Sequence, residues 1–299
     1  MSDYRPRRSA LYMPGSNARA LEKARTLAAD CLLLDLEDAV APDAKREARG
    51  QVAQAVKAGG YGKREIIVRV NGLATEWGEA DLAAAAALRP DAILIPKVEE
   101  AADLARARAR LEQAGADPGI ALWAMMETPL AVLNAQAIAA AGPGERYPLA
   151  VFVMGTNDLA KETGARLVPG REPMLAWLSI CVAAARAYGL DIIDGVYNDF
   201  RDEEGLRREC AQGRALGMDG KTLIHPGQIG PCNQIFSPVE EDVAWAGKVI
   251  AAFGLPENKG KGAITVEGRM VELLHAEMAR RTVAIARAIA ERQPDAEGA

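Results

Sequence analysis

The sequence has 299 residues, of which 49% are hydrophobic and 26% charged, a balance that excludes a disordered or collagen-like chain and predicts a substantial core. No apolar run reaches the roughly 18 residues that span a bilayer, and the first eight residues lack the apolar segment of a signal peptide, so we expect a cytoplasmic protein without a membrane partner. With 36 Lys and Arg against 41 Asp and Glu, the net charge is −5 and no long basic block predicts a nucleic-acid partner.

Eight short apolar or alternating segments recur along the chain, each bounded by turn residues. Their spacing is close to the roughly 31 residues per βα unit of a (β/α)8 barrel, and alanine-rich helical patterns fill the gaps. Strands that alternate with helices favour a parallel sheet, and eight of them favour closure into a TIM barrel, which we assign to residues 1–236. The predicted strands are Ser9–Met13, Cys31–Leu36, Ile66–Val70, Ala92–Ile95, Ala121–Met125, Ala150–Met154, Asp191–Asp194 and Lys221–Ile224.

Residues 237–299 are predicted to form a C-terminal helical extension that acts as a lid. Ser237 and Glu240 have the spacing of a capping box, with a proline at the first helical position, which predicts a helix to about Phe253. Gly254–Gly268 contains four glycines and is typical of a flexible connection. The extension is too small to fold alone, so we expect it to pack on its own barrel or on a neighbouring subunit. One face of a last helix is predicted to carry Val271, Leu274, Met278, Ile285 and Ile289.

The scarcity of histidine restricts the possible chemistry. Only His225 and His275 are present, which excludes a multi-histidine zinc site. We interpret His225 as a structural hydrogen-bonding group. The four cysteines have no C-x-x-C spacing and are expected to be buried thiols. The charged chemistry is therefore expected to rest on carboxylates, arginine and a hard cation held by oxygen ligands.

Polar residues follow the predicted strands at the ends that a barrel gathers on its catalytic face. Glu127 and Asp158 follow neighbouring strands, and two such carboxylates suit a Mg²⁺ ion that keeps positions for water or substrate oxygens. A solvated acidic rim or a helix N-cap is the structural alternative for either residue. Arg69 lies in an apolar strand, where a guanidinium is costly unless it faces anions, either of a substrate or in a salt bridge to Glu37 or Asp38.

Two further patterns concern backbone and surface. Gly155, Thr156 and Asn157 stand where a helix begins, and backbone N–H groups there can seat a carboxylate, although a turn without a ligand is nearly as compatible with the triplet. The arginine-rich stretches 5–8 and 106–110 are expected on solvated faces.

Eight motifs occur in order between about Arg8 and Ala290, and this order carries a resemblance. They are Arg8-Ser9 with Pro14-Gly15-Ser16, Leu34-Asp35-Leu36-Glu37-Asp38-Ala39-Val40, Val68-Arg69-Val70-Asn71, Pro96-Lys97-Val98, Glu127-Thr128, Gly155-Thr156-Asn157-Asp158, Asp194-Gly195, and Gly220 to Pro226. Together they resemble the HpcH/HpaI aldolase and citrate lyase β-subunit-like family, with malyl-CoA and citramalyl-CoA lyases as the closest likeness.

The resemblance implies residue roles in a (β/α)8 barrel. Glu127 and Asp158 would hold Mg²⁺, Arg69 would face the thioester and Glu37 would support the site. In the loop that contacts CoA, two residues match the family, whereas an arginine often found there is replaced. The matching residues are Tyr12 and Lys23, and the replacement is Asn17.

The resemblance also implies a homo-oligomer, a trimer or hexamer, whose C-terminal segment closes over a neighbouring subunit's site. In the lyases this segment supplies an Asp after a Gly-x-Met/Leu step, and the matching position here is Glu272. Glu272 is the expected catalytic acid or base, with Glu267 a weaker stand-in. The extra methylene matters, because an acid or base misplaced by about 1 Å can lose about 100-fold in rate.

The implied function is a Mg²⁺-dependent carbon–carbon lyase that cleaves, or forms by Claisen-type condensation, a β-hydroxyacyl-CoA such as malyl-CoA or citramalyl-CoA. Its partners would be an acyl-CoA thioester and a 2-oxo acid. Arg69, Glu37 and Glu272 would be catalytic, and Arg69 and Gly155–Asp158 would bind the substrate. The alternatives are a malyl-CoA-type thioesterase, a citrate lyase β subunit and a non-catalytic CoA-binding barrel. The acyl chain, the 2-oxo acid and the stereochemistry stay open.

Overall fold

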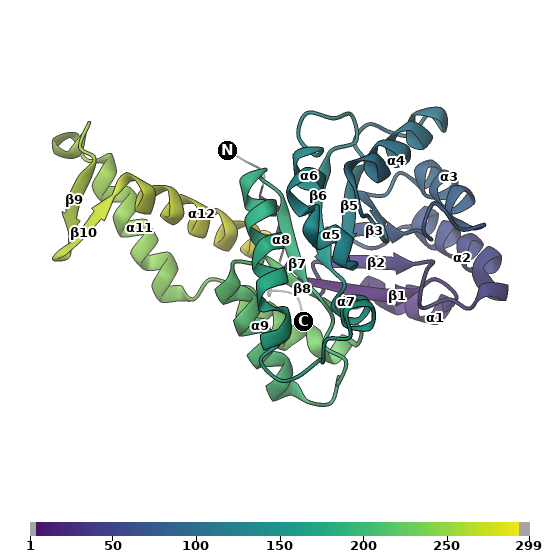
Figure 1. The fold of residues 1–299 in the computed structure, drawn as a ribbon. Coiled ribbons are helices and arrows are strands. Elements are labelled where there is room, and N and C mark those ends of the chain that lie inside the picture. Colours follow the sequence, from purple (N-terminus) through teal and green to yellow (C-terminus); the bar gives the residue numbers. More distant parts are fainter. Residues whose placement is uncertain (1–3, 293–299) are drawn as a thin grey trace. The chain divides into compact units, whose positions relative to one another are not determined.

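The computed structural model of the protein describes residues 4–292 (Figure 1). The chain forms two compact units. One spans Arg7–Gln234, and the other combines residues 4–6 with residues 235–292. The last seven residues of the extension expected over 237–299 lie outside the described range. Within that range, no helix has both the length and the apolarity to cross a bilayer.

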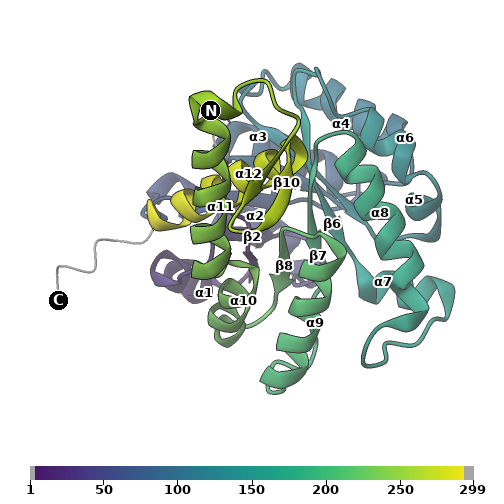
Figure 2. The same ribbon diagram turned by 90° about the vertical axis from the view of Figure 1, so that its left-hand side faces the viewer.

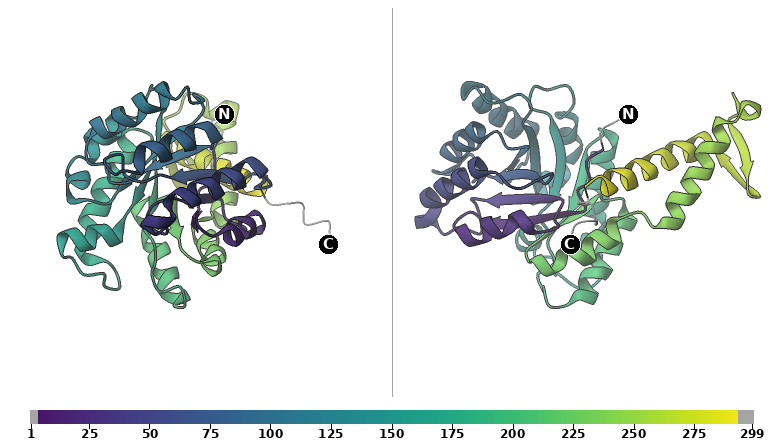
Figure 3. Two further views of the ribbon diagram at one scale, coloured as in Figure 1. Left: turned by 90° about the vertical axis from the view of Figure 1, so that its right-hand side faces the viewer. Right: turned by 180° about the vertical axis from the view of Figure 1, so that it is seen from behind.

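The larger unit is a closed barrel of eight parallel strands that pair in chain order, with β1 also pairing with β8. The predicted TIM barrel is confirmed, and each strand bound lies within one residue of its predicted position. The barrel helices form a ring around the strands (Figure 3). The strands are β1 Ser9–Pro14, β2 Cys31–Asp35, β3 Glu65–Arg69, β4 Ala92–Ile95, β5 Ala121–Met126, β6 Leu149–Met154, β7 Asp191–Asp194 and β8 Gly220–Leu223.

Local sequence sets the bounds of the barrel helices. Helix α9 begins where the Asp202 side chain accepts the Gly205 N–H at 2.8 Å, and it ends at Gly217, whose φ of 97° a glycine adopts without strain. The helices are α1 Ala18–Lys23, α2 Lys45–Ala58, α3 Gly78–Leu88, α4 Ala101–Gln113, α5 Pro129–Leu133, α6 Ala135–Ala140, α7 Thr156–Thr163, α8 Leu175–Ala187, α9 Glu203–Leu216 and α10 Ile229–Phe236.

Apolar side chains fill the barrel interior around Trp123, and all four cysteines are buried free thiols, as expected. The prediction that every arginine of the two rich stretches is solvated is wrong. Arg7 pairs with Glu65 and Asp191, which lie where β3 and β7 begin. Arg108 is also buried and donates to two backbone carbonyls. Carboxylates and backbone carbonyls that are distant in sequence offset the cost of removing these guanidinium groups from water.

The C-terminal unit contains two helices and a hairpin (Figure 2). Its elements are α11 Glu240–Gly254, β9 Ala263–Val266, β10 Arg269–Glu272 and α12 Leu273–Ala290. Its core joins α11 and α12 to the hairpin through Val249, Val266, Val271 and Ala276. The prediction that Ser237 caps this helix is wrong, because α11 begins after Val239, whose backbone is extended. Three acidic residues occupy the first turn of α11, where the helix dipole favours negative charge.

Two more expectations for this unit need correction. The connection Gly254–Gly268 is not wholly irregular, because Glu267 and Gly268 both have positive φ and close a two-residue turn between β9 and β10. The predicted apolar face of the last helix is only partly packed, because Ile289 is buried but other members of the face are not. Val271 belongs to β10, whereas Leu274 and Met278 are 51% and 63% exposed.

Candidate active site

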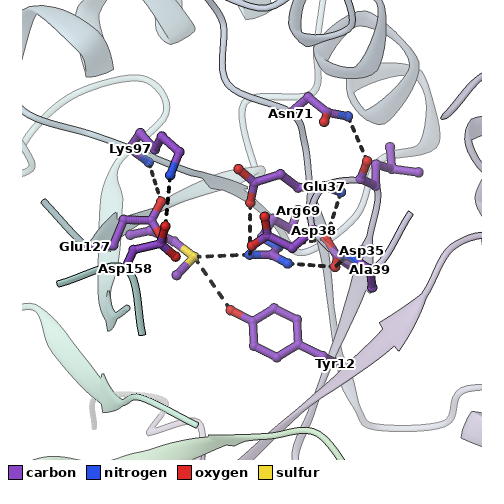
Figure 4. A network of polar contacts seen from close by, with 12 residues as sticks. Tyr12, Asp35, Glu37, Asp38, Ala39, Arg69, Asn71, Lys97, Glu127 and Asp158 are labelled. Carbon is purple, nitrogen blue, oxygen red and sulfur yellow. Dashed lines mark hydrogen bonds and ion pairs between the residues drawn. The ribbon is translucent and has the colours of Figure 1, made fainter. Parts of the chain in front are cut away.

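A buried arginine and three carboxylates form one half of the site at the C-terminal ends of β2 and β3 (Figure 4). Arg69 Nε and Nη2 each lie 2.7 Å from an oxygen of Asp35. Nη1 lies 2.9 Å from Glu37 Oε2 and 3.0 Å from Asp38 Oδ2. The bidentate pair with Asp35 fixes the plane of the guanidinium, so Nη1 is the nitrogen left to face the remaining groups.

Tyr12 lies against the same arginine. Its ring stands 4.7 Å from Arg69 Cζ, a cation–π distance, and its hydroxyl lies 3.6 Å from Met125 Sδ. Burial raises the pKa of Tyr12, so the phenol stays protonated at neutral pH. Tyr12, which the sequence predicts to contact CoA, therefore lies in the barrel interior and packs against Arg69.

Glu37 is the most perturbed carboxyl of the site. Burial raises its pKa from an ordinary 4.5 to about 8, against the opposing effect of Arg69, and Asp38, Glu127 and Asp35 add to the rise. Its Oε2 accepts no hydrogen bond within residues 4–292 despite its closeness to Arg69. Glu37 is therefore a carboxyl that can exchange a proton near neutral pH, the property of a general acid or base.

Glu127 and Asp158 form the other half of the site, and Lys97 contacts both (Figure 4). The Lys97 backbone N–H donates to Glu127 Oε1 at 2.8 Å, and its Nζ lies 3.3 Å from Asp158 Oδ1. Burial raises the pKa of Glu127, partly offset by Lys97. Burial lowers the pKa of Lys97, but Glu127 and Asp158 outweigh this and raise it overall, so the ammonium stays charged.

This carboxylate pair fits a hard divalent cation. No cluster of three or more His, Cys, Asp or Glu side chains suited to a metal occurs among residues 4–292, and Glu127 and Asp158 are the carboxylates that would hold a cation here. Mg²⁺ is commonly bound by one or two carboxylates, with water and substrate oxygens completing the octahedron. The Lys97 ammonium, 3.3 Å from Asp158, shows that a cation is already accommodated at this position.

The turn after β6 places Asp158 beside Glu127. A Cβ on Gly155 would meet Glu127 Cβ at 2.3 Å, so glycine is needed for this close approach. The Gly155 N–H is donated to Met126 O at 3.1 Å, which takes it away from any ligand. Thr156, Asn157 and Asp158 form the first turn of α7, where N–H groups have no intrahelical acceptor. The N–H groups that could bind a carboxylate therefore begin at Thr156, and the N–H of Gly155 is not one of them.

Two of the expected residues are not brought into this network. Lys23 is exposed at the end of α1, and none of the interactions described above involves it. Glu272 belongs to the C-terminal unit, where its backbone N–H donates to His275 Nδ1 at 2.9 Å. The roles of both residues stay predictions.

Other motif residues have structural contacts. Asp194 is fully buried between Arg171 and Lys221, at 2.7 and 3.0 Å, so it anchors the loop before α8 to the strands. His225 accepts the Gly227 N–H through Nδ1 at 3.1 Å, in line with its structural interpretation.

Sequence reasoning missed two residues of the site. Asp35 was not assigned as the partner of Arg69, although the two residues pair in register on adjacent strands and could have been matched from their equal distance to the strand ends. Lys97 received no role, and its position after β4, next to the strand that precedes Glu127, was the available signal.

Several known proteins are similar to this chain over most of its length. The model of the family described as HpcH/HpaI aldolase/citrate lyase matches residues 8–226. The chain is 54% identical over 286 residues to a (3S)-malyl-CoA thioesterase of Cereibacter sphaeroides, covering 95% of this chain and 96% of that protein. It is 34% identical to the mitochondrial citramalyl-CoA lyase of Rattus norvegicus, covering 97% and 88%.

A solved structure extends the likeness to the fold. The CitE protein of Mycobacterium tuberculosis, in complex with magnesium, acetoacetate and coenzyme A, has a TM-score of 0.71 and 30% identity over 93% of this chain and 97% of that one. These relatives are enzymes or enzyme subunits that act on or bind CoA compounds. The chain belongs to the HpcH/HpaI aldolase/citrate lyase family.

Proposed function

We propose that the barrel site converts a β-hydroxyacyl-CoA thioester of the malyl-CoA type with the help of Mg²⁺. The observation that carries this proposal is that one residue, Lys97, contacts both carboxylates, Glu127 through its backbone N–H and Asp158 through its ammonium, across from Arg69. Glu127 and Asp158 would hold the metal, which when bound supplies Lewis-acid polarisation and a template for the carboxylate and hydroxyl oxygens of the substrate.

The chain's own residues would handle the negative charge of the thioester oxygen. Asp35 holds the guanidinium of Arg69 in place, so Nη1 can donate to a developing oxyanion without reorienting. Asp38, whose side chain is 65% exposed, is the partner of Nη1 that a substrate oxygen can displace at low cost. The N–H groups that open α7 would hold a carboxylate of the substrate.

Hydrolysis is the first candidate reaction, and the 54% identical (3S)-malyl-CoA thioesterase favours it. Water would add to the thioester carbonyl, the C–S bond would break, and malate and CoA would leave. Glu37, with a pKa of about 8, can take part in moving the proton.

Carbon–carbon cleavage is the second candidate, and the citramalyl-CoA lyase relative favours it. A base would remove the proton of the β-hydroxyl, the bond between the α- and β-carbons would break to a thioester enolate and a 2-oxo acid, and an acid would protonate the α-carbon. Glu272 is the proposed acid, which requires the C-terminal unit of the same or a neighbouring subunit at the barrel mouth.

A homo-oligomer would meet that requirement. Met270, Leu273, Leu274 and Met278 of the C-terminal unit are between 51% and 72% exposed, and such apolar side chains commonly mark a contact surface. Light scattering coupled to size-exclusion chromatography should give three or six times the chain mass of 31.8 kDa. A monomer at micromolar concentration would contradict this part of the proposal.

Product analysis tests the reaction. The protein is incubated with Mg²⁺ and (3S)-malyl-CoA, and free thiol, acetyl-CoA and glyoxylate are followed by mass spectrometry. Hydrolysis yields malate and CoA in equal amounts, whereas cleavage yields acetyl-CoA and glyoxylate. Asp158→Ala is the matched control and should remove Mg²⁺-dependent turnover while circular dichroism stays unchanged. No turnover of malyl-CoA or citramalyl-CoA by the unaltered protein, or full activity of the variant, would overturn the proposal.

A further inference from the structure

Lys97 has an unusual backbone for its residue type. Its φ is 52°, in the left-handed region that residues other than glycine rarely adopt because of steric strain. This conformation directs the Lys97 N–H to Glu127 Oε1 at 2.8 Å. Such strain persists only where the surrounding structure compensates for it, and it is concentrated at functional sites. The backbone of Lys97 therefore positions the buried carboxylate of the pair.

The side chain of Lys97 acts on the other carboxylate. Its Nζ lies 3.3 Å from Asp158 Oδ1, and within residues 4–292 it is the only cationic group ion-paired with Asp158. Glu127 is almost fully buried at 1% exposure, so two carboxylates that repel each other would face one another without this ammonium. Arg69 is less able to serve both, because three other carboxylates surround it.

The ammonium is also able to leave. The side chain of Lys97 is 47% exposed, and its four-carbon stem can swing into solvent while the backbone N–H stays on Glu127. A divalent cation at the two carboxylates would repel the ammonium and compete for the same oxygen of Asp158. Because the ion pair is partly solvated, displacing it costs little, about the worth of a surface salt bridge.

We propose that the Lys97 ammonium is a built-in counter-ion of the Glu127–Asp158 pair, which a divalent cation must displace in order to bind. The inference rests on the metal assignment of the proposed function and adds a positioning residue to it. Lys97 would hold the two carboxylates together in the metal-free protein and weaken metal binding, so that the site exchanges the metal rather than retaining it.

Calorimetric titration of the full-length protein with MgCl₂, without substrate, tests this inference. Lys97→Met keeps most of the length of the side chain and the backbone N–H but removes the charge, and it should bind Mg²⁺ about threefold to fivefold more tightly than the unaltered protein. Lys97→Arg keeps the charge and should stay within about twofold. Equal or weaker binding by Lys97→Met would overturn the inference.

Thermal unfolding provides a readout that a purely structural role would not give. Without metal, Lys97→Met should unfold at a lower temperature than the unaltered protein, because its carboxylates have lost their counter-ion, and saturating Mg²⁺ should close this gap. An equal gap with and without Mg²⁺ would contradict the proposal. Asp158→Asn separates the proposed role of Lys97 from the proposed metal site. If neither this variant nor the unaltered protein binds Mg²⁺, the metal assignment itself is wrong.

Discussion

Asp35 and Arg69 face each other in register on β2 and β3, joined by two hydrogen bonds of 2.7 Å. Both side chains are almost fully buried, at 1% and 6% exposure. A charge in such surroundings is tolerated only while its partner is present. This pair therefore holds the rest of the carboxylate cluster around a fixed guanidinium.

Removing Asp35 should be costly. Asp35→Ala leaves an incompletely neutralised guanidinium in the barrel interior, and we expect the free energy of unfolding to fall by about 3–5 kcal/mol. Asp38→Ala removes an exposed partner of the same arginine and should cost about 0–1 kcal/mol. Urea unfolding followed by circular dichroism compares the two variants. Equal losses would show that burial of the pair does not decide its energy.

Glu37 should make stability depend on pH. Its folded pKa of about 8 lies above the ordinary 4.5, so the folded protein binds the proton more tightly than the unfolded chain. The stabilisation by protonated Glu37 is complete below about pH 4.5, declines as the pH rises toward 8 and is lost above it.

Glu37→Gln isolates this effect, because the amide does not titrate. Relative to the variant, the unaltered protein should lose unfolding free energy between pH 5 and 8, by at most about 1.4 kcal/mol per pH unit. Urea unfolding at several pH values measures the difference. A difference that does not change with pH would show that the carboxyl is ionised throughout.

Gly155 should tolerate no side chain. The Cβ of Gly155→Ala would lie 2.3 Å from Glu127 Cβ and 2.8 Å from its Oε2, so Glu127 must move and Mg²⁺ binding should weaken by at least about tenfold. Gly50 in α2 is the matched control, since no atom lies within 4 Å of its added Cβ. Gly50→Ala should stabilise the helix by up to about 1 kcal/mol and leave Mg²⁺ binding unchanged. Calorimetry would refute the expectation if both variants bound the metal alike.

Shortening Glu272 should shift the reaction toward carbon–carbon cleavage. If the extra methylene displaces the acid from the α-carbon by about 1 Å, Glu272→Asp should raise the release of acetyl-CoA and glyoxylate from malyl-CoA by about 10- to 100-fold. Glu267→Asp changes the same residue type in the neighbouring turn and should have no such effect. Unchanged or lower cleavage by Glu272→Asp would indicate a site shaped for hydrolysis or for another substrate.

Local sequence patterns are sufficient to predict the barrel. Apolar alternation and alanine-rich periodicity are properties of short segments, so all eight strands can be located from the amino-acid sequence alone. Glu127 and Asp158 can be paired as well, because parallel strands place their carboxyl ends on one rim. The hairpin of β9 and β10 escaped prediction, since its short strands depend on each other and on α11 and α12 for their packing.

The matching of the charges, by contrast, depends on the folded chain. Arg7 pairs with Glu65 and Asp191, partners 58 and 184 residues away, and no local pattern distinguishes it from a solvated arginine. The two contacts of Lys97 likewise depend on a left-handed backbone and on residues 30 and 61 positions further along the chain. The periodicity of the sequence determines which face of a helix or strand is buried. The partner of a buried charge is determined only when the barrel closes, because closure brings particular strand ends within about 3 Å of one another.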